Sequence, residues 1–331
     1  MFIKNISFGF KFFLITVAFT YVGSTHATEN KWKFNALVWK STGEANWNHD
    51  ATSINPGYGN PTSELSYENV KSDILELGIN YHQSGKKSHF RFKYGIGAID
   101  SGLLIDDDYL SAQGAEEVGT TQQGAHRFSR THSDIGGDSS SYFQLEFGYE
   151  AKAVPDKYSL EWRVGYEQWR ERYEAYGLTQ IECTASDVCD PVGTSGYQGE
   201  KVITNEVTWK SLYFGLDGAI NFTHKVILSG SVVLHPFADM ENEDIHHVRA
   251  DLAQDPSFAM SGDGLGYNLE ARLGFAFSKQ VTFSILYRYW HREVEDGNWR
   301  IYGANGGFNF AKLNKLEITR KGPAIEFVSA F

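Results

Sequence analysis

The chain has 331 residues, a formal net charge of −11 and two cysteines. The acidic balance argues against a nucleic-acid-binding protein, because no basic stripe is present to neutralise phosphates. Aromatic residues make up 15% of the chain, glycine is frequent (33) and proline is scarce (7), a mixture typical of a chain with many β-strands.

The N-terminus has the features of a secretory signal peptide. Two lysines accompany an apolar run over residues 12–22, and the small residues Thr25 and Ala27 follow at positions suited to cleavage. The run is shorter than the ~20 apolar residues that a membrane-spanning helix needs. We therefore expect residues 1–27 to be a signal peptide and 28–331 to form one domain.

Alternation of apolar and polar residues persists along nearly the whole mature chain. Within 205–222, for example, Leu212 and Phe214 are apolar whereas Ser211 and Asp217 are polar. Since successive side chains of a strand point to opposite faces, one face is apolar and the other polar. Ten such segments predict strands near 31–42, 64–82, 88–98, 140–152, 157–176, 200–222, 225–238, 263–278, 281–297 and 317–331.

A soluble β-sandwich would alternate too, but three features favour a membrane barrel. Many segments are far longer than the ~5–6 residues usual in soluble proteins. Glu, Arg and Lys occupy the polar face in mid-strand, where they need a wet or ion-paired lumen. The chain ends on Phe331, with Phe327 and Ile325 in phase, which resembles the signal read by the barrel assembly machinery. The prediction is an all-β fold, a transmembrane antiparallel β-barrel of about ten strands in the bacterial outer membrane.

The connections between these segments alternate strictly between tight turns and long loops. Transmembrane barrels have short periplasmic turns and long outer loops, so both termini are expected in the periplasm. The predicted loops facing the cell exterior are 43–63, 99–139, 177–199, 239–262 and 298–316.

Two acidic pairs in these loops could carry chemistry. Asp106 and Asp108, like Asp244 and His246, are two residues apart, which places both side chains of a pair on one face of an extended chain. A carboxylate beside an imidazole orients the ring and raises its basicity, as a general base requires. Two carboxyls held close together share a proton and can position a water molecule.

With these pairs in the second and fourth outer loops, the chain resembles the omptins, ten-stranded outer-membrane proteases with Asp-x-Asp and Asp-x-His at those places. The resemblance implies that Asp244 and His246 activate a water that Asp106 and Asp108 help to hold. It also implies cleavage between basic residues of extracellular peptides or host proteins. Lipopolysaccharide is then needed for activity and outer-membrane lipid is a partner, whereas no metal or other cofactor is expected.

The chain departs from the omptin pattern around the substrate. Tyr109 and Leu110 follow the Asp pair where the family tends to have Trp-Met, and Asn242 replaces an acidic residue of the pocket for a basic side chain. Glu44 is a candidate for the other pocket carboxylate. Glu44 and Asn242 are thus the predicted substrate-binding residues, and specificity for a basic side chain stays open.

Two cysteines and two arginines are the remaining candidate residues. Cys183 and Cys189 are expected to form a disulfide in the third loop, as an even pair in an exported chain. Arg170 and Arg172 could bind lipopolysaccharide phosphates, or could belong to an ordinary aromatic girdle with charged flanks.

The alternatives to a protease are an adhesin-like or structural barrel without chemistry and a small pore. The pore ranks last, because side chains should fill so narrow a barrel and leave little free channel.

Overall fold

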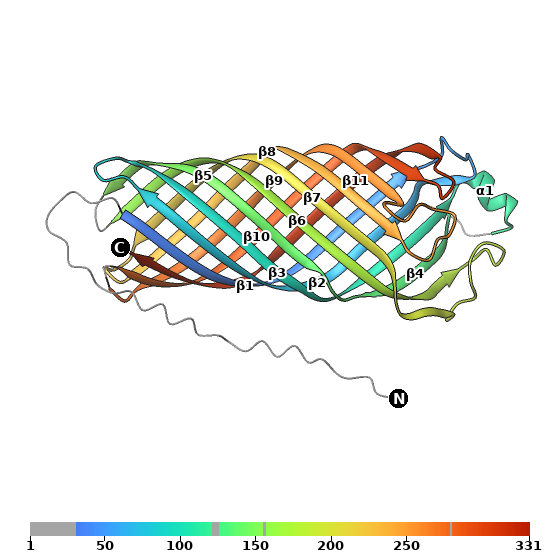
Figure 1. The fold of residues 1–331 in the computed structure, drawn as a ribbon, viewed down its shortest axis with the longest axis horizontal. Coiled ribbons are helices and arrows are strands. Elements are labelled where there is room, and N and C mark those ends of the chain that lie inside the picture. Colours follow the sequence, from blue (N-terminus) through green and yellow to red (C-terminus); the bar gives the residue numbers. More distant parts are fainter. Residues whose placement is uncertain (1–30, 121–125, 155–156, 279) are drawn as a thin grey trace, which may run out of the picture.

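The computed structural model of the protein describes residues 31–120, 126–154, 157–278 and 280–331; the predicted signal peptide lies outside these residues. The described chain folds almost entirely into strands, with one short helix (Figure 1). No helix in this part of the chain is long and apolar enough to cross a membrane. The elements are β1 (Lys31–Asp50), β2 (Tyr58–His82), β3 (Ser88–Leu110), α1 (Ala112–Glu117), β4 (Arg127–Ile135), β5 (Ser139–Val154), β6 (Tyr158–Cys183), β7 (Ser195–Asn221), β8 (Val226–His246), β9 (Phe258–Ala276), β10 (Val281–Tyr302) and β11 (Phe308–Ala330).

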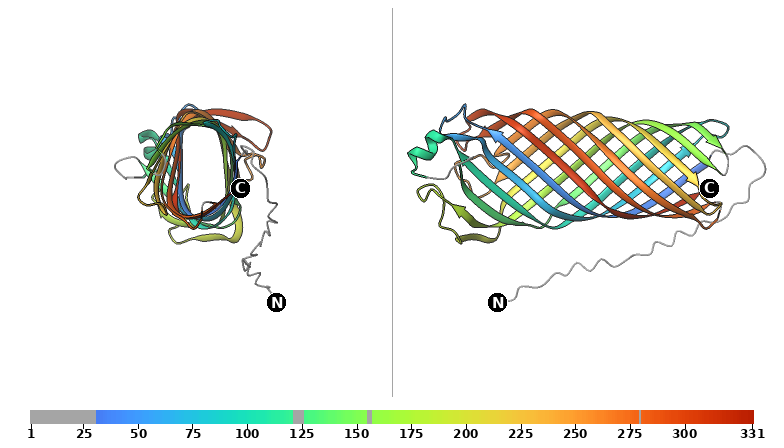
Figure 2. Two further views of the ribbon diagram at one scale, coloured as in Figure 1. Left: turned by 90° about the vertical axis from the view of Figure 1, so that its left-hand side faces the viewer. Right: turned by 180° about the vertical axis from the view of Figure 1, so that it is seen from behind.

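The strands form one closed antiparallel sheet. β1 pairs with both β2 and β11, so the first and last strands seal the ring, which is seen end-on in Figure 2. β4 and β5 follow one another in the space between β3 and β6, so the eleven strands occupy ten positions around the ring. Gly137 and Asp138 have positive φ angles of 111° and 71° between these two strands, a conformation that interrupts a regular ladder. The prediction of an antiparallel barrel of about ten strands is confirmed.

A belt of exposed apolar side chains encircles the barrel on its outer face. In β3 it consists of Phe90, Phe92, Tyr94 and Ile96, which are 40–61% exposed. A continuous apolar surface of this kind is rare in water and typical of the lipid-facing side of a membrane barrel. The belt continues on the neighbouring strands with Leu75, Leu77, Ile79, Leu145, Val164, Leu212, Phe214, Leu216, Leu228, Val232, Leu269, Ile285, Tyr287, Ile325 and Phe327.

Beyond the belt the strands run much further than the sequence predicts. β3 extends to Leu110 and β8 to His246, so most of the predicted loops 99–139 and 239–262 is strand. Beyond the belt the outer face of a strand carries polar side chains such as Glu241 and Glu243, and the inner face mixes apolar and polar ones such as Met240 and Asn242, so the apolar-out, polar-in pattern is lost. The backbone ladder continues there, which is why these loop predictions were wrong.

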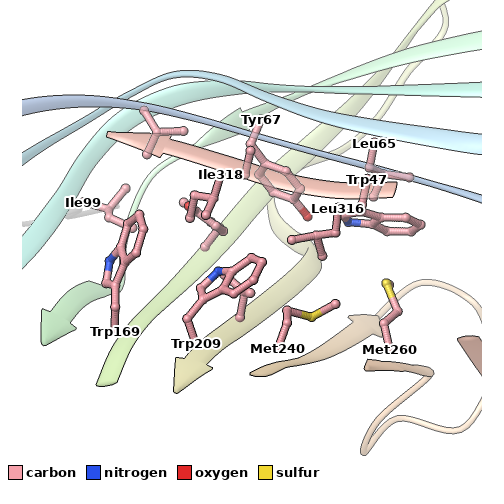
Figure 3. Packing of buried hydrophobic residues seen from close by; sticks show 14 of the residues in the cluster. Trp47, Leu65, Tyr67, Ile99, Trp169, Trp209, Met240, Met260, Leu316 and Ile318 are labelled. Atoms are coloured by element: carbon pink, nitrogen blue, oxygen red, sulfur yellow. The ribbon is translucent and has the colours of Figure 1, made fainter. Parts of the chain in front are cut away.

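The long connections and α1 gather at one end of the barrel, and the C-terminus lies at the other end among the short turns (Figure 1). Between the two ends, side chains from facing walls meet across the interior. The rings of Trp39 and Trp169, from β1 and β6, each contact Trp290 from β10, at centroid distances of 5.1 and 5.6 Å. Figure 3 shows part of this packing, with Tyr67, Trp169, Trp209 and Met240 pointing into the same interior space. This packed layer closes the barrel below the end that carries the long connections.

Candidate active site

Asp106 and Asp108 lie on the inner face of β3, above the apolar belt. The hydroxyl of Ser63 on β2 donates to Asp106 Oδ1 at 3.1 Å. Burial raises the pKa of Asp106 well above its ordinary value, and the neighbouring carboxylates of Asp108 and Asp244 add to this rise. Burial also raises the pKa of Asp108 to about 6. The two carboxyls therefore hold protons more tightly than exposed aspartates do.

The intervening Asp107 points the opposite way. Its carboxylate accepts two hydrogen bonds from Arg130 of β4, both of 2.6 Å, and lies 3.7 Å from Arg127. Such a bidentate pair fixes the orientation of the carboxylate against β4. Period-two alternation thus separates one aspartate of the triplet from the other two.

Asp244 and His246 lie on the inner face of β8. Asp244 is fully buried, and its Oδ2 lies 3.4 Å from Nε2 of His246. The backbone N–H of His246 donates to the Ser257 hydroxyl at 3.0 Å, and the edge of the imidazole meets Phe258 at a centroid distance of 4.8 Å. The ring is therefore fixed on three sides, with a carboxylate behind it.

The structure brings the two pairs together. A cavity of about 920 Å³ opens among the outer strand ends, and Asp106, Asp108 and His246 line it. β3 and β8 are not neighbours in the ring, so the pairs approach one another across the lumen. Accordingly, His246 lowers the pKa of Asp108 while Asp244 raises that of Asp106.

Other polar side chains of the site were missed by sequence reasoning. His49 of β1 lines the cavity, and burial lowers its pKa, with nearby His246 as a second cause. Tyr67 of β2 is buried beneath, and burial together with Asp244 and Asp106 raises the pKa of its hydroxyl. His49 is in phase with the inward Trp39 and Trp47; the predicted first strand ended too early, at residue 42, to include it.

The predicted substrate-binding residues are not in the cavity. Glu44 lies on the outer face of β1, exposed and 3.6 Å from Lys321; its even position puts it out of phase with the inward side chains of the strand. Asn242 is on the inner face of β8, but it is buried and exchanges two hydrogen bonds with Asn205, of 3.0 and 3.1 Å. Neither side chain lines the cavity that holds Asp106, Asp108 and His246, although Asn242 lines a second cavity together with Met260 and Trp299. A role of Glu44 and Asn242 in substrate binding stays a prediction.

The remaining candidates lie around this site. Arg170 and Arg172 are on the outer face of β6, where they form ion pairs with Glu206 and Asp138. Cys183 and Cys189 form a disulfide, and the loop that it closes supplies cavity-lining residues. Among the described residues, no group of three or more His, Cys, Asp or Glu side chains is arranged to hold a metal ion.

Comparisons with known proteins agree with this architecture. The fold is similar to that of the outer membrane protease OmpT from Escherichia coli, with a TM-score of 0.73 and 13% sequence identity over 91% of this chain and 97% of that one. At this identity the likeness shows the fold alone. More distant barrels are a Pseudomonas aeruginosa FadL homologue (TM-score 0.30, 11% identity, covering 91% and 90% of the two chains) and the translocator domain of the autotransporter NalP from Neisseria meningitidis (0.37, 9%, 91% and 88%).

No curated protein matches the sequence. A family model does: that of the Protochlamydia outer membrane proteins matches residues 27–319, nearly the whole of the described barrel. The match agrees with the apolar belt in placing the protein in the outer membrane. The chain therefore belongs to the Protochlamydia outer membrane protein family.

Proposed function

We propose that this barrel is an omptin-like endopeptidase that cleaves peptides at its extracellular mouth. One observation carries the proposal. Two pairs of the right chemical types, Asp106 with Asp108 and Asp244 with His246, come from facing walls and meet at one cavity. Each pair alone is ordinary in a solvated rim, whereas their convergence around enclosed space is what water activation requires.

The roles follow from the geometry. Asp244 faces Nε2 of His246, which holds the ring with Nδ1 available as general base. Nδ1 takes a proton from a water whose oxygen attacks the peptide carbonyl carbon. The proton then passes to the leaving amine as the C–N bond breaks. Asp106 and Asp108 share a proton, hold the water and donate to the developing oxyanion.

Partners follow from the location of the site. We propose that the long connections face the cell exterior, so that substrates are extracellular peptides or host proteins. Arg170 and Arg172 are partly exposed on the outer face of β6, above the apolar belt, and we propose that they bind lipopolysaccharide phosphates. If so, replacing both with Gln should weaken any stimulation of cleavage by lipopolysaccharide without altering the folded barrel.

The test is cleavage of a mixed peptide library by refolded protein with lipopolysaccharide. General-base assistance typically contributes about 10²–10⁴-fold, so His246→Ala should lose on the order of that factor while the barrel stays folded. Mass spectrometry of the products gives rates and cleavage sites together. If wild-type protein cuts nothing in the library, or if His246→Ala cuts equally well, the proposal fails and an adhesin-like or structural barrel becomes the better account.

A further inference from the structure

One wall of the mouth cavity, beside His246, is built from aromatic rings. Phe258 of β9 touches the imidazole edge-on, Trp299 of β10 packs against Phe258 at a centroid distance of 5.0 Å, and Trp47 of β1 lies 6.4 Å from Trp299. All three rings line the cavity. They therefore form a continuous apolar surface, the aromatic wall, that begins at the proposed general base.

Among the described residues that line the cavity, no carboxylate comes from β1, β9 or β10, the strands that carry the aromatic wall; the inward Asp106 and Asp108 belong to β3 and to the proposed water site. Asp251 lines the cavity, but Arg249 occupies both of its oxygens through hydrogen bonds of 2.8 and 2.7 Å. Asp187, inside the disulfide-closed loop, and Asp190, just after it, belong to the connection between β6 and β7, on another side of the ring. A lysine or arginine side chain seated on the wall would be desolvated without a counter-ion, which is costly.

Polar atoms of the aromatic wall and of the adjoining His49 lack internal partners among the described residues. Nε1 of Trp47, Nε1 of Trp299 and Nδ1 of His49 are buried and have no hydrogen-bond partner in the described part of the chain. His49 packs directly against the Trp299 ring and is only 4% exposed. Buried polar groups in folded proteins are nearly always paired, so this wall is not completed by the chain's own groups, as expected of a surface that receives a ligand.

We infer that the aromatic wall, formed by Trp47, Phe258 and Trp299, is the specificity subsite of the proposed protease and takes a large aromatic or apolar side chain next to the scissile bond. The inference rests on the proposed function for its link to cleavage. Binding of the side chain rests only on the wall itself. Stacking and burial of apolar area would then select the substrate, in place of the ion pairing that a basic specificity requires.

The test measures binding apart from catalysis. Asp106→Asn protein, refolded with lipopolysaccharide, is titrated into two labelled alanine-rich peptides that differ only by Phe or Arg at the central position. Fluorescence anisotropy should show at least ten-fold tighter binding of the Phe peptide. Adding Trp299→Leu should weaken binding of the Phe peptide by a similar factor, whereas adding Trp32→Leu, the same change at the opposite end of the barrel, should leave it unaltered.

Trp47→Leu serves as a second wall variant should Trp299→Leu fail to fold, with folding checked by heat-modifiable gel migration. Equal or tighter binding of the Arg peptide, as guanidinium stacking on indoles would produce, would overturn the inference, as would wall variants that bind like their parent. A Phe preference in the inactive variant together with no cleavage by wild-type protein would uphold the subsite and refute the protease. Cleavage confined to basic residues would support the protease and refute the aromatic subsite.

Discussion

At the scale of single residues, the triplet Asp106, Asp107 and Asp108 shows how alternation assigns chemistry. Asp107 faces outward and is neutralised by Arg130, so it contributes to the structure of the rim. Its neighbours face inward, form no ion pair with an arginine of the described chain, and have raised pKa values. Adjacent aspartates thus have different roles. Asp107 forms a structural ion pair, whereas Asp106 and Asp108 are a candidate catalytic pair.

The raised pKa of Asp108 predicts a cost in stability at neutral pH. The folded protein holds this proton up to about pH 6, whereas the ordinary value is 3.8. Between these values the folded state binds more protons than the unfolded state, so stability falls as pH rises through the window. Asp108→Asn should therefore stabilise the barrel at pH 8, by no more than about 3 kcal/mol, and change it little at pH 4.

Urea unfolding in detergent micelles at both pH values checks this prediction. Asp107→Asn is the matched control, because it removes a carboxylate that is paired with Arg130; it should give no gain at pH 8. An Asp108→Asn variant that is less stable than wild type at pH 8 would show that this carboxyl is not strained by burial.

At the scale of elements, β6 and β10 are joined across the lumen by a buried ion pair. Glu167 and Arg292 are both fully buried and bonded to one another. Removing one partner of such a pair leaves an uncompensated charge, which typically costs about 3–5 kcal/mol. We expect a loss of this size for Arg292→Met and recovery of most of it in the double variant with Glu167→Gln.

Unfolding midpoints of the single and double variants provide the measurement. Arg170→Met breaks a largely exposed pair with Glu206 and should cost less than about 1 kcal/mol. If Arg292→Met is as mild as Arg170→Met, water reaches the interior and the lumen is not sealed at this level.

The environment of each strand decides whether it could be predicted from the sequence. Within the apolar belt one face meets lipid and the other the lumen, so alternation such as that of Leu212 and Phe214 predicted the strands. Above the belt the outer face is polar and the inner face is mixed, as Met240 and Asn242 show, and these parts of β3 and β8 were predicted as loops. The pairing of Asp106 with Asp108 and of Asp244 with His246 could still be inferred, because residues two positions apart lie on the same face of any extended segment.

The parts of the site that sequence missed depend on contacts between distant strands. The aromatic wall combines β1, β9 and β10, and no local pattern reports that Trp47, Phe258 and Trp299 meet. The position of Glu44 has a simpler cause: strand phase, set by Trp39 and Trp47, places residue 44 on the outer face of β1.

At the scale of the whole molecule, the barrel is closed in the middle and open at the end that carries the site. Rings from β1, β6 and β10 meet in the interior, which favours a surface-acting protein over a pore. The arrangement predicts that proteases added to intact cells cut the connections 184–194 and 247–257. Cuts confined to the tight turns at 83–87 and 222–225 would mean that the barrel is inserted the other way.

The central claim is that the inward carboxyls at the mouth perform peptide hydrolysis. Asp106→Asn and Asp107→Asn make the same small change on adjacent residues, and only the face of β3 differs. Initial rates of cleavage of one library-selected peptide, compared between these variants and wild type, test the claim most directly. We predict a loss on the order of 100-fold or more for Asp106→Asn and a near wild-type rate for Asp107→Asn; equal rates for the two variants would contradict the account.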